Sequence, residues 1–127
     1  MIVLDASVLI AHLDGSDAHH ARATERLLDL AGEELGASSI TLAEVLVAPT
    51  RANRLDAARA ALRTLCIVEL QLPADASERL ASLRVKTSLK LPDCCVLLSA
   101  EAAGGAVLTF DGRLAREALK LGLAVND

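Results

Sequence analysis

The chain begins MIVLDASVLIA (residues 1–11), where two apolar runs are separated by an acid. Residues 2–4 are apolar and mostly β-branched, which predicts a short buried strand. Residues 8–11 are again apolar, and Asp5 lies between the two runs. A buried carboxylate without a partner costs several kcal/mol. The position of Asp5 at this junction therefore needs an explanation from the rest of the sequence.

Short apolar runs alternate with amphipathic stretches along the whole chain. Further short strands are predicted at residues 35–38, 67–70, 106–109 and 123–125. Apolar residues at helical spacing predict helices at residues 17–31, 41–48, 55–65, 76–87, 93–103 and 114–121. The helix at 41–48 is expected to break near Pro49. This alternation favours a single α/β domain over residues 1–127, with a mainly parallel sheet covered by helices on both faces.

Composition excludes several classes of protein. Hydrophobic residues make up 53 % of the chain and charged residues 24 %, which is typical of a soluble globular protein and excludes a disordered one. Apolar runs stay below the roughly 20 residues that span a bilayer, so we expect no membrane contact and a cytoplasmic location. The net charge of −4 argues against a generic nucleic-acid binder. With Phe110 as the only aromatic residue, a base-stacking surface is not expected.

Four acids lie at strand ends or in otherwise apolar helices. Asp5 follows the strand at 2–4 and Asp111 follows the strand at 106–109, so both belong at the carboxyl edge of the sheet. Ligands bind at that edge in open α/β sheets. Asp93 opens a helix after Pro92, and Glu44 interrupts an apolar helix.

Each acid taken alone also has an ordinary structural explanation. Asp5, Asp93 and Asp111 all precede or begin helices, where an N-cap or a first-turn acid is favoured. The sequence Thr41-x-x-Glu44 matches a capping box, in which Glu44 would bind a backbone N–H. Single positions therefore leave both readings open.

The four acids as a set indicate a metal site. Two carboxylates about 5 Å apart repel each other by about 3 kcal/mol at an effective dielectric constant near 20. Four converging carboxylates would therefore require a cation or partial protonation. Carboxylate oxygen ligands select Mg²⁺ or Mn²⁺, which suits phosphoryl chemistry with an activated water.

Four short motifs carry a resemblance to a known family. They are I-V-L-D-A-S-V-L-I-A from residue 2, T-L-A-E-V around Glu44, L-P-D at Asp93 and V-L-T-F-D at Asp111. In their order and spacing they resemble the PIN domain, and over residues 1–125 the chain is similar to the toxin ribonucleases of VapBC toxin–antitoxin pairs.

The resemblance implies a three-layer α/β/α sandwich and a Mg²⁺- or Mn²⁺-dependent endoribonuclease acting on tRNA, rRNA or mRNA. It implies Asp5 and Asp93 as the main metal ligands, with Glu44 and Asp111 acting directly or through water. Ser7 and Thr109 fall where the family has supporting hydroxyl groups. A homodimer and a cognate VapB-like antitoxin are the implied partners. Gly112 stands where a further acid is sometimes found, which leaves a second metal open.

Arginines supply candidate contacts to RNA phosphates, which provide most nonspecific affinity for nucleic acid. A solvated helix face is the alternative explanation for such a cluster. The candidates are Arg51, Arg54, Arg59, Arg63 and Arg113.

Three other functions remain as alternatives. A receiver-like, Mg²⁺-binding signalling domain would use Asp5 as a phosphate acceptor, but it needs paired acids early in the chain and a lysine at a late strand end. A dehalogenase-type phosphatase would need D-x-D, whereas Ala6-Ser7 follow Asp5. A PIN-type module that binds without turnover is the third possibility.

Overall fold

A computed structural model describes residues 1–126 and contains five strands and seven helices in that range. The strands are β1 (Ile2–Leu4), β2 (Leu35–Ser38), β3 (Val68–Leu70), β4 (Ala106–Leu108) and β5 (Val125–Asn126). The helices are α1 (Ala6–Leu13), α2 (His20–Asp29), α3 (Ser39–Arg51), α4 (Leu55–Thr64), α5 (Ala76–Thr87), α6 (Leu91–Ala103) and α7 (Gly112–Lys120). Within residues 1–126, none of the helices has the length and apolar character needed to cross a membrane.

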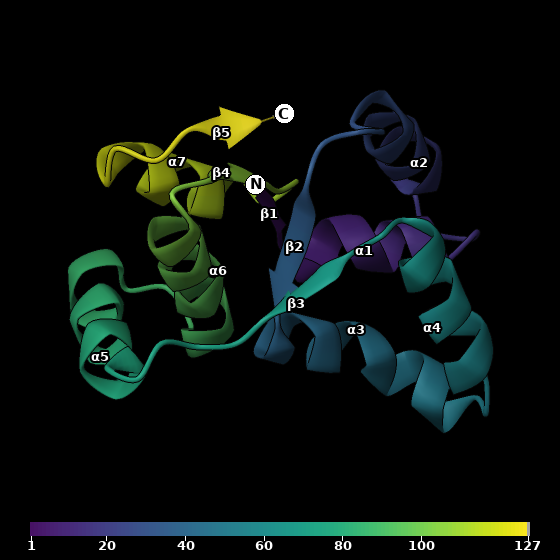
Figure 1. Ribbon diagram of the computed structural model, residues 1–127, viewed down its shortest axis with the longest axis horizontal. Coiled ribbons are helices and arrows are strands. Elements are labelled where there is room, and N and C mark those ends of the chain that lie inside the picture. The colour runs from purple at the N-terminus through teal and green to yellow at the C-terminus, as the bar shows by residue number, and fades with distance from the viewer. Residues whose placement is uncertain (127) are drawn as a thin grey trace.

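The five strands form one parallel sheet in the order β3-β2-β1-β4-β5. The central strand β1 pairs with β2 on one side and with β4 on the other. Helices α1 to α4 lie on one side of the sheet and α5 to α7 on the other (Figure 1). The predicted α/β/α sandwich with a parallel central sheet is therefore confirmed.

Alternate residues of the central strands enter two separate cores. Ile2, Leu4 and Leu108 pack with the helices α1 to α4, whereas Val3 and Val107 pack with α5, α6 and α7. Because both faces of the sheet are covered at its centre, β1 and β4 are short uninterrupted apolar runs and do not alternate with polar residues. This double burial explains why the strands are visible in the sequence.

Backbone pairing brings the ends of β1 and β4 together. Leu4 lies opposite Leu108, and the N–H of Asp5 donates a hydrogen bond to the carbonyl oxygen of Leu108 (3.2 Å). The chain segments that follow these two strands therefore start side by side at the carboxyl edge of the sheet, as the sequence predicts for Asp5 and Asp111.

The helix boundaries near two prolines differ from the prediction. Helix α3 does not break near Pro49 but continues to Arg51. Pro49 lacks the N–H that would donate to the carbonyl oxygen of Val45, so it removes one hydrogen bond of the last turn, and α3 continues for only two residues beyond it. Helix α6 begins at Leu91, two residues earlier than predicted, because Pro92 occupies its first turn, where a missing N–H costs nothing.

Candidate active site

Asp5 is buried and serves two roles that the sequence presented as alternatives. Its side chain is 4 % exposed and caps helix α1 by accepting a hydrogen bond from the N–H of Val8 (3.3 Å). The same carboxylate accepts hydrogen bonds from the hydroxyl of Ser7 (2.6 Å) and from the hydroxyl of Thr109. Asp5 is therefore both a helix cap and a carboxylate fixed in one orientation by side chains from the first turn of α1 and from the loop after β4.

The two hydroxyl residues connect the first turn of α1, which contains Ser7, to the loop after β4, which contains Thr109. Ser7 Oγ accepts a hydrogen bond from the N–H of Phe110 (3.2 Å), and Thr109 Oγ1 accepts one from the N–H of Asp111 (2.9 Å). Each hydroxyl thus donates to Asp5 and accepts from the backbone of the loop after β4. The supporting positions predicted for Ser7 and Thr109 agree with these contacts.

Asp111 is exposed and caps helix α7. Its Oδ1 atom accepts hydrogen bonds from the N–H groups of Arg113 (2.9 Å) and Leu114 (3.2 Å). Among the described residues, no donor is bound to its second oxygen, Oδ2. Asp111 therefore combines a structural cap with a carboxylate oxygen available to a ligand.

Glu44 has no capping role, so the capping-box interpretation is wrong. The N-cap of α3 is Ser38, whose Oγ accepts the N–H of Thr41 (3.0 Å) and donates to the hydroxyl of Thr41 (3.1 Å). Because α3 begins at Ser39, Glu44 lies in its second turn, beyond the reach of the first N–H groups. The exposed Glu44 side chain makes no hydrogen bond to any residue between 1 and 126.

The electrostatics link the four acids into one centre. Burial raises the pKa of Asp5, and the charge of Asp111 raises it further. Hydrogen bonds from the hydroxyls of Ser7 and Thr109 and from the N–H of Val8 partly offset this increase. Partial burial, followed by the charges of Asp93 and Asp5, raises the pKa of Glu44. Each of these carboxylates is therefore harder to ionise because of the others.

Asp93 experiences the same repulsion and also two compensating cations. Partial burial raises its pKa most, and Asp111 and Asp5 raise it further. Lys90 and Arg113 act in the opposite direction. The repulsion from Asp111 and Asp5 adds to the effect of burial on the pKa of Asp93, and a divalent cation at this place would compensate that repulsion.

The donor set fits a hard divalent cation that retains water ligands. All four acids offer oxygen, as Mg²⁺ and Mn²⁺ prefer. No group of three acidic, histidine or cysteine side chains within residues 1–126 is close enough to hold a metal by itself. Magnesium commonly binds through one or two carboxylates, several waters and substrate phosphates. Such an ion matches the residues better than a zinc ion, which takes three or four protein ligands.

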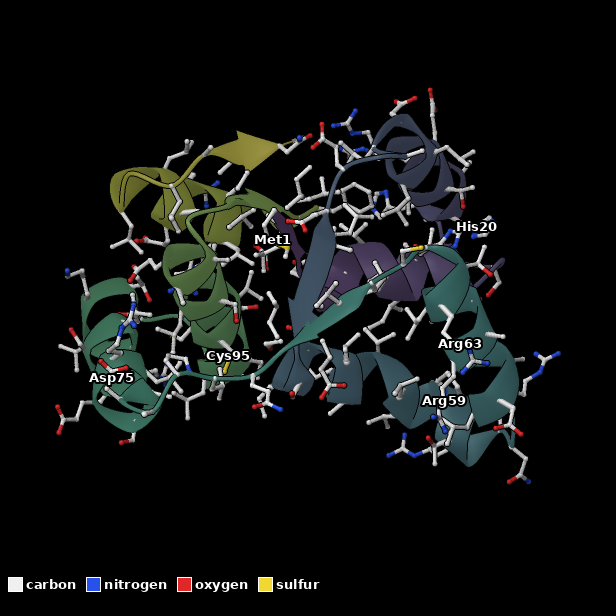
Figure 2. The ribbon with its side chains drawn as sticks, in the orientation of Figure 1. Met1, His20, Arg59, Arg63, Asp75 and Cys95 are labelled. Atoms are coloured by element: carbon white, nitrogen blue, oxygen red, sulfur yellow. The ribbon has the colours of Figure 1, made fainter. Side chains whose placement is uncertain are left out.

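The predicted RNA-binding arginines are all exposed but do not form one group. Arg113 acts on the pKa of Asp93. Arg54 and Glu44 both line an open cavity of about 500 Å³ between α1, α3 and α4. Arg59 and Arg63 project from α4 (Figure 2), and Arg51 ends α3. Only Arg54 and Arg113 are tied to the acids by these observations.

The structure adds one basic residue that the sequence analysis missed. The guanidinium carbon of Arg22, in the first turn of α2, lies 4.4 Å from the centre of the Phe110 ring. The His19 ring lies 5.8 Å from the same ring, tilted by 48°. In the sequence, the position of Phe110 between Thr109 and Asp111 was the feature that could have indicated an aromatic contact beside the acids.

The fold and this acidic site define a class of protein, an α/β/α domain with carboxylates gathered at the carboxyl edge of a parallel sheet. The sequence model of the PIN-domain family matches residues 2–119 of this chain. The chain belongs to the PIN-domain family. Membership of this family argues against the receiver-like domain and the dehalogenase-type phosphatase as alternatives.

Solved structures with the same fold include proteins of toxin–antitoxin pairs. The sarcin-ricin loop cleaving toxin VapC20 of Mycobacterium tuberculosis is 21 % identical, with a TM-score of 0.76 over 91 % of this chain and 94 % of that one. A toxin–antitoxin complex from Klebsiella pneumoniae is 26 % identical, with a TM-score of 0.70 over 87 % of each chain. FitAcB from Neisseria gonorrhoeae is 21 % identical, with a TM-score of 0.74 over 100 % of this chain and 97 % of that one. A search among curated proteins finds no significant match.

Proposed function

We propose that the protein is the toxin of a toxin–antitoxin pair and acts as a metal-dependent endoribonuclease. The observation that supports this proposal is that, in a PIN domain, the charge of Asp111 raises the pKa of Asp5 and Asp93, and the charges of Asp5 and Asp93 raise the pKa of Glu44. The Klebsiella pneumoniae relative is a toxin–antitoxin complex and the Mycobacterium tuberculosis relative cleaves the sarcin-ricin loop. The first description supports a toxin–antitoxin role for this chain, and the second supports a cleavage reaction.

In the proposed reaction, Asp5 and Asp93 hold Mg²⁺ or Mn²⁺, and Glu44 and Asp111 contribute directly or through water. Such an ion, when bound, supplies charge for the scissile phosphate and lowers the pKa of a water molecule. The carboxylates orient that water for in-line attack and accept its proton. Ser7 and Thr109 keep both oxygens of Asp5 fixed by hydrogen bonds. The expected products carry 5′-phosphate and 3′-hydroxyl ends.

The proposal includes a cognate antitoxin and a homodimer as protein partners. Neighbouring structures are complexes of toxin and antitoxin. The cavity between α1, α3 and α4 has mostly apolar lining residues and reaches Glu44. An antitoxin segment in this cavity would bring a basic side chain to the acids and block them. Exposed apolar side chains, among them Leu28, Val85 and Leu119, supply surface for protein contacts.

The proposed function is tested by analysing RNA fragments. Purified protein is incubated with structured RNA and Mg²⁺, with and without EDTA, and the fragment ends are mapped. We expect site-specific fragments with 5′-phosphates that appear only with the metal. Asp93→Asn should yield none, while the control Asp75→Asn, on the exposed start of α5 (Figure 2), should cleave like the wild type. Cleavage that persists in EDTA or in Asp93→Asn would contradict the proposal.

A further inference from the structure

Arg22 and Phe110 form a cation–π pair beside the acidic centre. The guanidinium group stacks over the ring at 4.4 Å, although the two residues belong to α2 and to the loop between β4 and α7. Such pairs are attractive because the face of an aromatic ring carries partial negative charge. The ring therefore limits the positions that the exposed arginine samples.

Phe110 is itself anchored to the acidic centre by its neighbours. Its N–H donates to Ser7 Oγ, and Ser7 donates to Asp5. Thr109, on one side, donates to Asp5, and Asp111, on the other side, belongs to the centre. Through Phe110, the position of Arg22 is thus fixed relative to the carboxylates by a short chain of contacts.

The charge of Arg22 is not used by the protein. Among residues 1–126, no carboxylate forms an ion pair with Arg22, whereas Arg26 and Arg79 pair with Asp29, Asp75 and Glu101. The first turn of α2 contains no acid. Arg22 does not figure among the charges that shift the pKa of Asp5, Glu44 or Asp93. An exposed guanidinium, ordered by a ring and left without an anion, offers several N–H donors to a ligand.

We infer that Arg22, positioned by Phe110, binds a backbone phosphate of the RNA next to the phosphate that is hydrolysed. This inference rests on the proposed function. An acidic centre repels the flanking phosphates of its own substrate, so cations are needed on both sides of it. Lys90 and Arg113 act on the Asp93 side. Arg22 provides the cation on the side of the loop that contains Phe110, and Phe110 acts only through Arg22.

The test measures RNA binding in the Asp93→Asn background, which the proposed function makes unable to cleave. The Kd of a labelled RNA that the wild type cleaves is measured by fluorescence anisotropy at several salt concentrations. We expect Arg22→Ala to weaken binding roughly tenfold. It should also reduce the slope of log Kd against log salt by about 0.7, as expected for one lost contact to single-stranded phosphate. Arg79→Ala, which removes an arginine already paired with acids, is the matched control and should change neither value.

The role of Phe110 is tested by a double-mutant cycle. Phe110→Leu keeps an apolar side chain but removes the aromatic face, so we expect weaker RNA binding when Arg22 is present. In the Arg22→Ala background, Phe110→Leu should have no further effect, because its contribution passes through the arginine. A merely structural role would give the same loss in both backgrounds.

The outcomes separate this inference from the function on which it rests. An unchanged Kd and salt slope for Arg22→Ala, in a protein whose wild type cleaves RNA with Mg²⁺, overturns the inference alone. A wild type that neither cleaves nor binds RNA overturns the proposed function and the inference with it. If Arg22→Ala lowers the melting temperature but leaves the RNA affinity unchanged, the cation–π pair only stabilises the packing of α2. That result also overturns the inference.

Discussion

At the scale of single residues, one carboxylate serves both the fold and the site. Asp5 caps α1 and is surrounded by three donors, and burial nevertheless raises its pKa. The capping explanation and the metal-site explanation of Asp5 are therefore compatible, which the sequence alone did not reveal. The same holds for Asp111, which caps α7 and raises the pKa of Asp93.

Asp93→Asn should stabilise the metal-free protein although it removes the proposed activity. The pKa of Asp93 is raised, so folding favours the protonated acid. The stability that depends on this group is complete below its ordinary pKa and is lost as pH rises through the raised pKa. At pH 7 in EDTA, the uncharged amide avoids this loss, and Asp93 makes no hydrogen bond to residues 1–126 that the change would break. Thermal unfolding should show a melting temperature a few degrees above the wild type.

The matched control for that comparison is Asp75→Asn, which should leave the melting temperature close to the wild type. The gain from Asp93→Asn should also shrink as pH falls towards the ordinary pKa of an aspartate, because both proteins are then uncharged at this position. A lower melting temperature for Asp93→Asn at pH 7 in EDTA would show that Asp93 is not under charge repulsion.

Thr109→Val should weaken the response of RNA cleavage to Mg²⁺. Valine retains the shape of the buried Thr109 but removes the hydroxyl that donates to Asp5 and accepts from Asp111. Loss of such a supporting contact typically costs about 10–100-fold in metal affinity or activity. Titration of cleavage rate with Mg²⁺ should show the loss, and Thr109→Ser should retain most of the activity. Equal activity of the valine and serine variants would argue against a positioning role.

At the scale of elements, the sequence predicted all five strands and six of the seven helices between residues 1 and 126, but not helix α1 (Ala6–Leu13), and it placed several helix boundaries wrongly. The strands are recognisable because residues such as Val3 and Val107 are buried on covered faces. The residue at which a helix begins depends on which side chain accepts hydrogen bonds from its first N–H groups. Ser38 and Thr41 are both good caps, and only the end of β2 at Ser38 decides between them.

Ser38→Ala should lower the free energy of unfolding by about 1 kcal/mol, the usual cost of losing an N-cap. Ser38 is fully buried and binds both the N–H and the hydroxyl of Thr41, so alanine leaves these groups without their partner. Urea unfolding followed by circular dichroism measures the change. The control is Ser39→Ala, whose hydroxyl contacts only the exposed Glu69 and should matter little. If both variants unfold alike, Ser38 is not the effective cap of α3.

At the scale of the whole molecule, a parallel topology collects acids that are far apart in the sequence. The meeting of Asp5 and Asp111 at one edge of the sheet was predictable, because both follow buried strands that are visible as apolar runs. The place of Glu44 and Asp93 in the same set came only from the resemblance to the PIN domain. The contact between Arg22 and Phe110 was not predictable, since it depends on how α2 packs over the loop after β4. The roles of the four acids in metal binding and catalysis remain predictions.

The most direct test of the central claim is the initial rate of RNA cleavage as a function of Mg²⁺ concentration, measured for the wild type and for Asp5→Asn, Glu44→Gln, Asp93→Asn and Asp111→Asn. The account predicts that the wild-type rate rises from zero and saturates with Mg²⁺. It also predicts that each amide variant is strongly impaired at every concentration, because the four acids share one centre. A wild-type rate independent of Mg²⁺, or an Asp93→Asn variant as fast as the wild type, would contradict it.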